Sequence, residues 1–206
     1  MTFIVAIQLE DSIIVAADNR SVVVQESGDL QYRDDSTSKI YAWKSGIIVG
    51  SGESTVVSRA IEFFIKISKS KIETLPQCLN ISRQIRELEA ENFHIQTTKL
   101  LYSDNVENGV QLYNIQPSEQ GEYQITKCEE NGIVLWLFNP DVTAIIKDLE
   151  ALYASLKPRE YFCSTRDWLN YYIEQFSQIY KKQAQTDSMM SSSFDVFFQS
   201  SVDYIF

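Results

Sequence analysis

The chain is short of the residues on which most catalytic centres depend. Its 206 residues include one histidine, His94, and no Gly-x-Ser-x-Gly motif. A serine-hydrolase triad would therefore rest on His94 alone, and histidine-rich metal sites lack ligands. A lone histidine after a helix is more often structural than functional. Any catalysis is expected to come from Ser, Thr, Cys, Lys, Asp or the chain terminus.

Cysteines and long apolar runs are also scarce. Cys78, Cys128 and Cys163 lie far apart and form no Cys-x-x-Cys pair, which argues against a disulfide framework or a zinc knuckle. No apolar run reaches the roughly 18 to 20 residues that span a bilayer. Residues 1–10 contain no basic segment and do not resemble a signal peptide. These absences predict a cytoplasmic protein with no membrane partner.

Basic residues are in the minority. The sequence has 18 Lys and Arg against 28 Asp and Glu, which gives a net charge of −10 at pH 7. Binding to nucleic-acid phosphates needs clustered Lys and Arg, whereas the basic residues here are scattered. The composition argues against a nucleic-acid partner, and we interpret the acidity as a source of solubility.

The chain does contain two sets of predicted strands, each followed by a pair of predicted helices. No linker, repeat or low-complexity segment interrupts them, so we expect one domain over residues 1–206. This order predicts an α+β fold, a four-layer αββα sandwich of two antiparallel sheets with helices on the outer faces. The expected strands are 2–8, 13–17, 22–24, 30–32, 39–43, 47–50, 98–103, 110–115, 123–127, 133–138, 194–198 and 202–205. The expected helices are one after Gly52 and others near 74–91, 140–156 and 165–184.

Two local details accompany this assignment. The helix after Gly52 has one apolar face, and Ser54 or Thr55 is its expected N-cap. The stretch 25–29 is expected to form the turn of a small hairpin, because it is polar and contains Gly28.

Four short segments follow one another in the N-terminal third. They are Thr2-Phe3-Ile4-Val5-Ala6-Ile7, Ala16-Ala17-Asp18-Asn19-Arg20, Ser38-Lys39-Ile40 and Gly50-Ser51-Gly52. Together they resemble the proteasome β-subunit family, which opens with a Thr and a strand, then has Ala-Ala-Asp-x-Arg, a Lys-Ile/Val strand start and a small-residue turn. The Thr2–Asp18 spacing matches without a gap. The Arg20–Lys39 step is longer by about five residues, which a surface hairpin accommodates.

The resemblance implies a hydrolase of amide or peptide bonds that needs no metal or organic cofactor. Thr2, exposed by removal of Met1, would supply the hydroxyl nucleophile and the α-amine base, whose ordinary pKa is about 7.7 to 8. Asp18 would hold the Lys39 ammonium, which lowers the pKa of nearby groups, and Arg20 would brace the same strand end. The Gly52 N–H is the expected oxyanion donor. The substrate pocket would include Ser21, Val22 and Thr55.

The C-terminal half departs from the family pattern. The family has a Gly-Ser-Gly segment whose Ser touches the terminal Thr, and Glu130-Asn131-Gly132 stands there in this chain, with Asn131 in the Ser position. Asp187 matches a second family residue. Met190 occupies the position of the Ser that follows it, unless Ser191 takes that role. A methionine cannot orient an amine through hydrogen bonds.

These departures leave alternatives open. One is an amide hydrolase with a specialised, non-peptide substrate, and another is an inactive subunit of the same fold that acts as a structural component. The resemblance also implies a homo-oligomer and allows for an ATPase partner. From the residues alone, eleven Tyr and eleven Phe could instead form the contact surfaces of a protein-interaction module.

Overall fold

The computed structural model of the chain describes residues 2–24, 30–107, 109–200 and 204–205. The described residues form two compact units. Residues 1–39, 106–110 and 129–206 make up the first unit, and residues 40–105 and 111–128 make up the second. Met1 and the expected hairpin turn at 25–29 lie outside the described residues. A single domain over the whole chain stays a prediction.

The first unit is built on an antiparallel sheet with the strand order β10-β1-β2-β11-β12. All residues of β1 and β2 are buried, and most of them are β-branched or small, as suits strands inside a sheet. A two-stranded hairpin, β3-β4, belongs to the same unit. The strands are β1 (Ile4–Gln8), β2 (Ser12–Asp18), β3 (Ser21–Val24), β4 (Leu30–Asp34), β10 (Gly132–Trp136), β11 (Phe194–Ser200) and β12 (Tyr204–Ile205).

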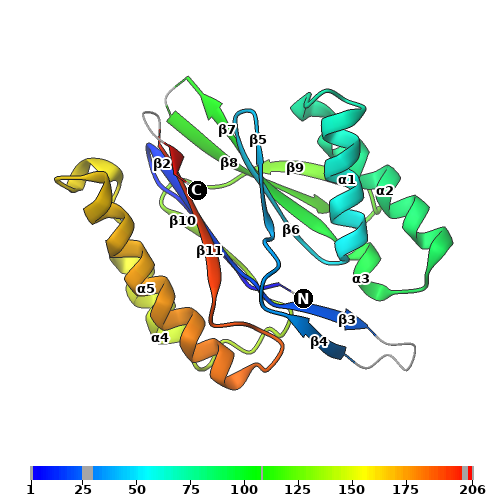
Figure 1. Ribbon diagram of the computed structural model, residues 1–206. Helices are drawn as coiled ribbons and strands as arrows, with labels where there is room; N and C mark the ends of the chain where they lie inside the picture. Colours follow the sequence, from blue (N-terminus) through cyan, green and yellow to red (C-terminus); the bar gives the residue numbers. More distant parts are fainter. Residues whose placement is uncertain (1, 25–29, 108, 201–203, 206) are drawn as a thin grey trace. The chain divides into compact units, whose positions relative to one another are not determined.

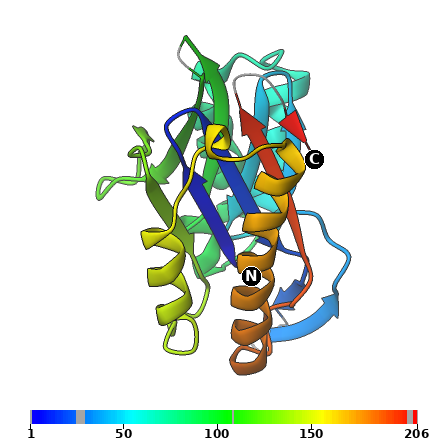
Figure 2. The ribbon, with the colours of Figure 1, turned by 90° about the vertical axis from the view of Figure 1, so that its left-hand side faces the viewer.

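Two helices, α4 (Ile146–Ala154) and α5 (Thr165–Thr186), lie side by side along one face of this sheet, and the short helix η2 (Arg159–Tyr161) precedes α5 (Figure 2). Alternate side chains of β1 point into the hydrophobic core that these helices cover. Aromatic residues at helical spacing along α5 pack there and give this helix its apolar face. The buried members of this core include Phe3, Val5, Ile7, Trp168, Tyr172, Phe176, Tyr180 and Met190.

The second unit contains a five-stranded antiparallel sheet in the order β5-β6-β7-β8-β9. Helices α1 and α2 pack on it, and their apolar faces form the second hydrophobic core with residues of β6, β7 and β8 (Figure 1). The elements are β5 (Ile40–Trp43), β6 (Gly46–Ser51), α1 (Ser54–Lys66), η1 (Ile72–Thr74), α2 (Leu75–Glu89), α3 (Phe93–Gln96), β7 (Lys99–Val106), β8 (Gly109–Pro117) and β9 (Tyr123–Lys127).

Three details differ from the sequence-based expectations. Helix α4 begins at Ile146 rather than near Pro140, because the backbone N–H of Thr143 is bonded to the Asp141 side chain at 3.0 Å. Such local bonds compete with helix formation. Helix α1 is capped by Glu53, which accepts from the Val56 N–H at 2.8 Å, and not by Ser54 or Thr55. The short helix α3 was not expected.

Gly52 offers a test of the tight turn before α1. Its φ is +115°, and an added Cβ would lie 2.5 Å from the Thr98 Cα, so Gly52→Ala combines backbone strain with a clash against main chain. We expect it to lower the free energy of unfolding by about 3 kcal/mol in urea titrations. Gly121→Ala is the control, because Gly121 also has a positive φ, of +82°, but open space around it. Its cost should be about 1 kcal/mol, and equal losses would refute the clash with Thr98.

Candidate active site

Asp18 is a buried acid at the end of β2. Its exposed fraction is 0%, and both of its carboxylate oxygens accept hydrogen bonds. Oδ1 accepts from the Phe3 N–H at 2.7 Å and from the Lys39 ammonium at 2.6 Å, and Oδ2 accepts from the Arg20 N–H at 3.1 Å. A carboxylate so far from water needs such donors to stay charged. Asp18 therefore joins the start of the chain, the turn after β2 and the cation of Lys39.

Hydrogen bonds also fix the carbonyl group of Phe3, the residue that follows Thr2. The Phe3 carbonyl accepts from the Asp18 N–H at 3.0 Å and from the Tyr180 hydroxyl at 3.3 Å. The rings of Phe3 and Tyr180 also pack, with centroids 4.5 Å apart. Thr2 is 6% exposed. The position of Thr2 thus follows from contacts made by its neighbour.

The sequence analysis did not single out Tyr180, whose hydroxyl bonds the Phe3 carbonyl. Burial, with a contribution from the nearby Asp18 charge, raises the pKa of Tyr180 well above its ordinary value. The hydroxyl therefore remains a donor. The signal that could have found it is the choice of Tyr over Phe inside an apolar stripe, because a buried hydroxyl requires a partner.

Lys39 ends the first unit and is almost as buried as Asp18. Its side chain is 11% exposed. Burial lowers the pKa of Lys39 below its ordinary value, although the charge of Asp18 opposes the shift. Because Lys39 and Phe3 share one oxygen of Asp18, the ammonium lies within two hydrogen-bond lengths of the Phe3 amide. The structure thus brings Asp18, Lys39 and the start of β1 together.

Arg20 connects the end of β2 to two loops. Its Nε and Nη2 bond the two oxygens of Asp35 at 2.7 and 2.8 Å, and its Nη1 bonds the Ser188 carbonyl at 2.5 Å. The guanidinium also lies over the ring of Tyr32, 4.9 Å from the centroid. Asp35 and Tyr32 were not singled out from the sequence, because their contacts with Arg20 depend on the pairing of β4 with β3 and on the path of the loop after β4.

The loop after α5 contains Asp187 and the two candidates for the expected serine position, Met190 and Ser191. The Asp187 carboxylate accepts from the Met189 N–H at 2.9 Å and so shapes the loop. Met190 is 4% exposed and belongs to the hydrophobic core of the first unit. The Ser191 hydroxyl instead bonds the Ser193 hydroxyl at 2.7 Å and interacts with Asp35. The polar neighbour of the Arg20–Asp35 pair is therefore Ser191.

Asn131 is not placed near Thr2, and the expectation that it contacts the Thr2 amine is wrong. Strand β10 runs antiparallel to β1 with Gly132 opposite Gln8 and Trp136 opposite Ile4. Asn131 therefore lies beyond the far end of β1, roughly 20 Å from Thr2 at about 3.3 Å per residue. Asn131 has a φ of 55°. This left-handed conformation, which Asn tolerates well, fits a turn residue.

The remaining predicted residues divide between the two units. Ser21 and Val22 lie on β3, opposite Asp34 and Tyr32, with an irregularity in the pairing between them. Gly52 and Thr55 belong to the second unit, where Gly52 precedes α1 and Thr55 lies in its first turn. The oxyanion role of Gly52 and the pocket roles of Ser21, Val22 and Thr55 stay predictions.

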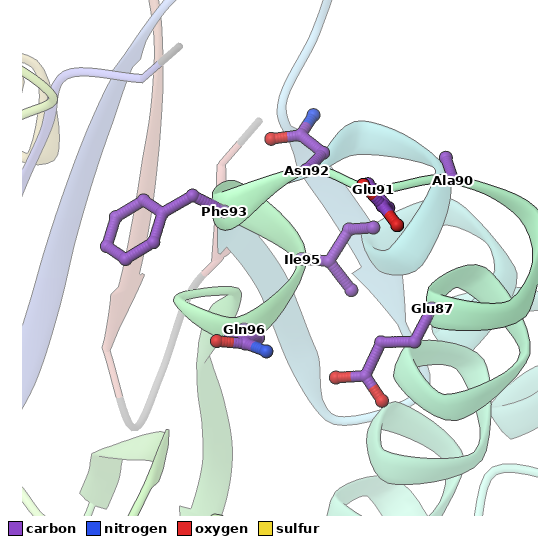
Figure 3. A pocket seen from close by; sticks show the side chains of 7 residues that line it. All are labelled: Glu87, Ala90, Glu91, Asn92, Phe93, Ile95 and Gln96. Atoms are coloured by element: carbon purple, nitrogen blue, oxygen red, sulfur yellow. The ribbon is translucent and has the colours of Figure 1, made fainter.

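A pocket of about 320 Å³ lies wholly in the second unit, around the end of α2 and the start of α3 (Figure 3). None of the predicted site residues lines it, and its lining contains no nucleophile. Its two acids are Glu87, which pairs with Arg83, and Glu91. The lining residues are Glu87, Ala90, Glu91, Asn92, Phe93, Ile95 and Gln96.

Within the described ranges, no three His, Cys, Asp or Glu side chains are grouped so that they could hold a metal ion. No helix in the same ranges combines the length and the apolar character needed to cross a bilayer.

Comparison with solved structures finds 256 similar chains, HslV and Anbu among them. Eukaryotic HslV from Trypanosoma brucei aligns over 96% of this chain and 98% of its own, with a TM-score of 0.54 and 14% identity. Anbu, the ancestral beta-subunit, from Yersinia bercovieri aligns over 98% and 83%, with a TM-score of 0.65 and 10% identity. The chain has a proteasome-like fold. The expected α+β class is thereby confirmed, and at these identities the likeness concerns the fold alone. No protein-family model and no curated protein sequence matches the chain.

The buried pair of Asp18 and Lys39 can be tested by a double-mutant cycle. Asp18→Asn leaves the Lys39 ammonium buried without its counter-charge, so we expect it to lower the free energy of unfolding by about 3 kcal/mol. Lys39→Met, combined with it, should cost much less than the sum of the two single changes. Urea titration of the four proteins measures the coupling.

The exposed pair of Lys182 and Asp148, in the same unit, is the control for this cycle. Its coupling should stay below about 1 kcal/mol, because water screens exposed ion pairs. Equal coupling energies for the two pairs would contradict the buried character of the Asp18–Lys39 pair.

Proposed function

We propose that the chain is a threonine-nucleophile hydrolase of amide or peptide bonds, with Thr2 as the nucleophile after removal of Met1. The observation that supports this most is the shared carboxylate oxygen of Asp18, which accepts from both the Phe3 N–H and the Lys39 ammonium. A cation is thereby held beside the first residues of the chain. A terminal threonine requires such a cation to ease loss of its proton.

The proposed reaction has two stages. The Thr2 Oγ attacks the substrate carbonyl while its proton passes through water to the Thr2 α-amine, whose ordinary pKa of about 7.7 to 8 suits a base at neutral pH. The oxyanion is stabilised by the Gly52 N–H, the C–N bond breaks, and the leaving amine takes the proton from the α-ammonium. Water then attacks the acyl ester, which releases the acid and restores the Thr2 hydroxyl.

Several finer features belong to the same proposal. Ser21, Val22 and Thr55 would line the substrate pocket, and Asp187 would support the site through the loop that it shapes. The protein would work in the cytoplasm as a homo-oligomer, and an ATPase partner is compatible with this activity. The likeness to HslV and Anbu supports the subunit fold on which these features rest.

An inactive subunit is the second candidate, and two observations favour it. Asn131 lies at the far end of β1, and Met190 is buried in the core, so neither position offers a polar group to the Thr2 amine. In this case the chain would be a structural component of an oligomer. The network around Asp18 would then serve stability alone.

The two candidates are separated by labelling with an epoxyketone or β-lactone probe. Protein from its native host should lack Met1 by intact mass and should gain one adduct, which maps to Thr2. The labelling rate should rise through about pH 7 to 8 as the α-amine loses its proton. Lys39→Met should slow labelling at least about tenfold.

Two variants control this experiment. Thr2→Ala should take up no probe, whereas Thr126→Ala, which alters an exposed threonine on β9, should label like the unmodified protein. Retention of Met1 in native-host protein would refute the Thr2 mechanism and leave the inactive subunit as the better description.

A further inference from the structure

The short segment between β4 and Lys39 is tied to the end of β2 by two kinds of bond. Within the segment, Oδ1 of Asp34 accepts from the Ser36 N–H and the Thr37 hydroxyl, each at 3.0 Å. The Thr37 N–H then bonds the Asn19 carbonyl at 3.1 Å. These hydrogen bonds shape the turn, but none of them joins two charged groups.

The second tie is the ion pair of Asp35 and Arg20. Both nitrogen–oxygen contacts are shorter than 3 Å, and the side chains are only 35% and 20% exposed. Such a two-pronged pair fixes the orientation of both groups, unlike a single contact between flexible side chains. The Arg20 backbone N–H also bonds Asp18, which in turn bonds the Lys39 ammonium. One chain of contacts therefore runs from Asp35 through Arg20 and Asp18 to Lys39.

We propose that Asp35 is a positioning residue of the candidate active site, which acts through its ion pair with Arg20 to hold the segment of Lys39 against β2, so that the ammonium stays on Asp18. This inference deepens the proposed function and rests on it for its catalytic meaning. Lys39 has a long and flexible side chain, and its place beside the Phe3 amide requires its backbone to be fixed four residues after Asp35.

The charges around Lys39 make this role measurable. Among the described residues, the charges of Asp18, Asp35 and Arg20 act on the Lys39 ammonium. The two acids raise the pKa of Lys39, and Arg20 lowers it. The members of the Asp35–Arg20 pair therefore act on Lys39 in opposite directions. Loss of the charges alone would therefore shift this pKa in opposite directions for the two members. A pair that holds the segment of Lys39 in place should instead give the same direction of shift whichever member is replaced.

The experiment measures the apparent pKa of Lys39 from the pH dependence of its acylation by acetic anhydride, followed by peptide mass spectrometry on the full chain. Asp35→Asn and Arg20→Gln should both lower this pKa by about 0.5 unit, because each breaks the pair and leaves the ammonium less firmly held on Asp18. Asp35→Glu, which keeps the charge, should restore a value near that of the unmodified protein. Asp35→Asn should also slow labelling of Thr2 by the β-lactone about tenfold.

The controls are Asp34→Asn, in the same turn, and Asp148→Asn, which breaks the exposed pair with Lys182. Neither should move the Lys39 pKa, and thermal melting confirms that each variant is folded. Shifts of opposite sign for Asp35→Asn and Arg20→Gln, or no shift in either, would overturn the proposal. If the unmodified protein gives no Thr2 adduct, the proposed function fails, yet downward shifts in both variants would still establish that Asp35 positions Lys39.

Discussion

The burial of one charge, the carboxylate of Asp18, is the constraint on which the first unit depends. A fully buried carboxylate is unfavourable unless donors surround it, and the fold supplies them from three places: the Phe3 N–H, the Arg20 N–H and the Lys39 ammonium. Each donor fixes a different stretch of chain. The start of β1, the turn after β2 and the segment before β5 therefore share one point of attachment.

The same arrangement explains why the polar groups form a network instead of isolated pairs. Arg20 bonds Asp18 through its backbone and Asp35 through its side chain, and the loop after α5 joins through Ser188 and Ser191. On the opposite side, the Tyr180 hydroxyl reaches the Phe3 carbonyl from the hydrophobic core. Polar and apolar contacts thus fix the positions of the same few residues. Loss of the polar contacts should therefore weaken the apolar packing, and loss of the packing should weaken the polar contacts.

Sequence reasoning found the parts of this structure that depend on local pattern. The strands and most helices follow from apolar periodicity, and Asp18 and Lys39 were recognised from short motifs close to each other in the chain. Asn131 was misplaced because the pairing of β10 with β1 joins residues more than a hundred positions apart, and no local pattern reports its register. Asp35 was missed because the path of the loop after β4 brings it to Arg20, and the Tyr180 hydroxyl was missed because its partner, Phe3, lies 177 positions away. The start of α4 was misjudged because side-chain bonds to the backbone compete with helix formation.

The strand order has a consequence for synthesis of the protein on the ribosome. Strand β11 pairs along the whole of β2, with Phe194 opposite Asp18, so this neighbour of β2 is translated long after β2 itself. The loop that receives Arg20 follows it by 168 positions. A nascent chain therefore carries an unfinished sheet with an open edge until β11 has been made. During that time the acid that is later buried lacks part of its surroundings.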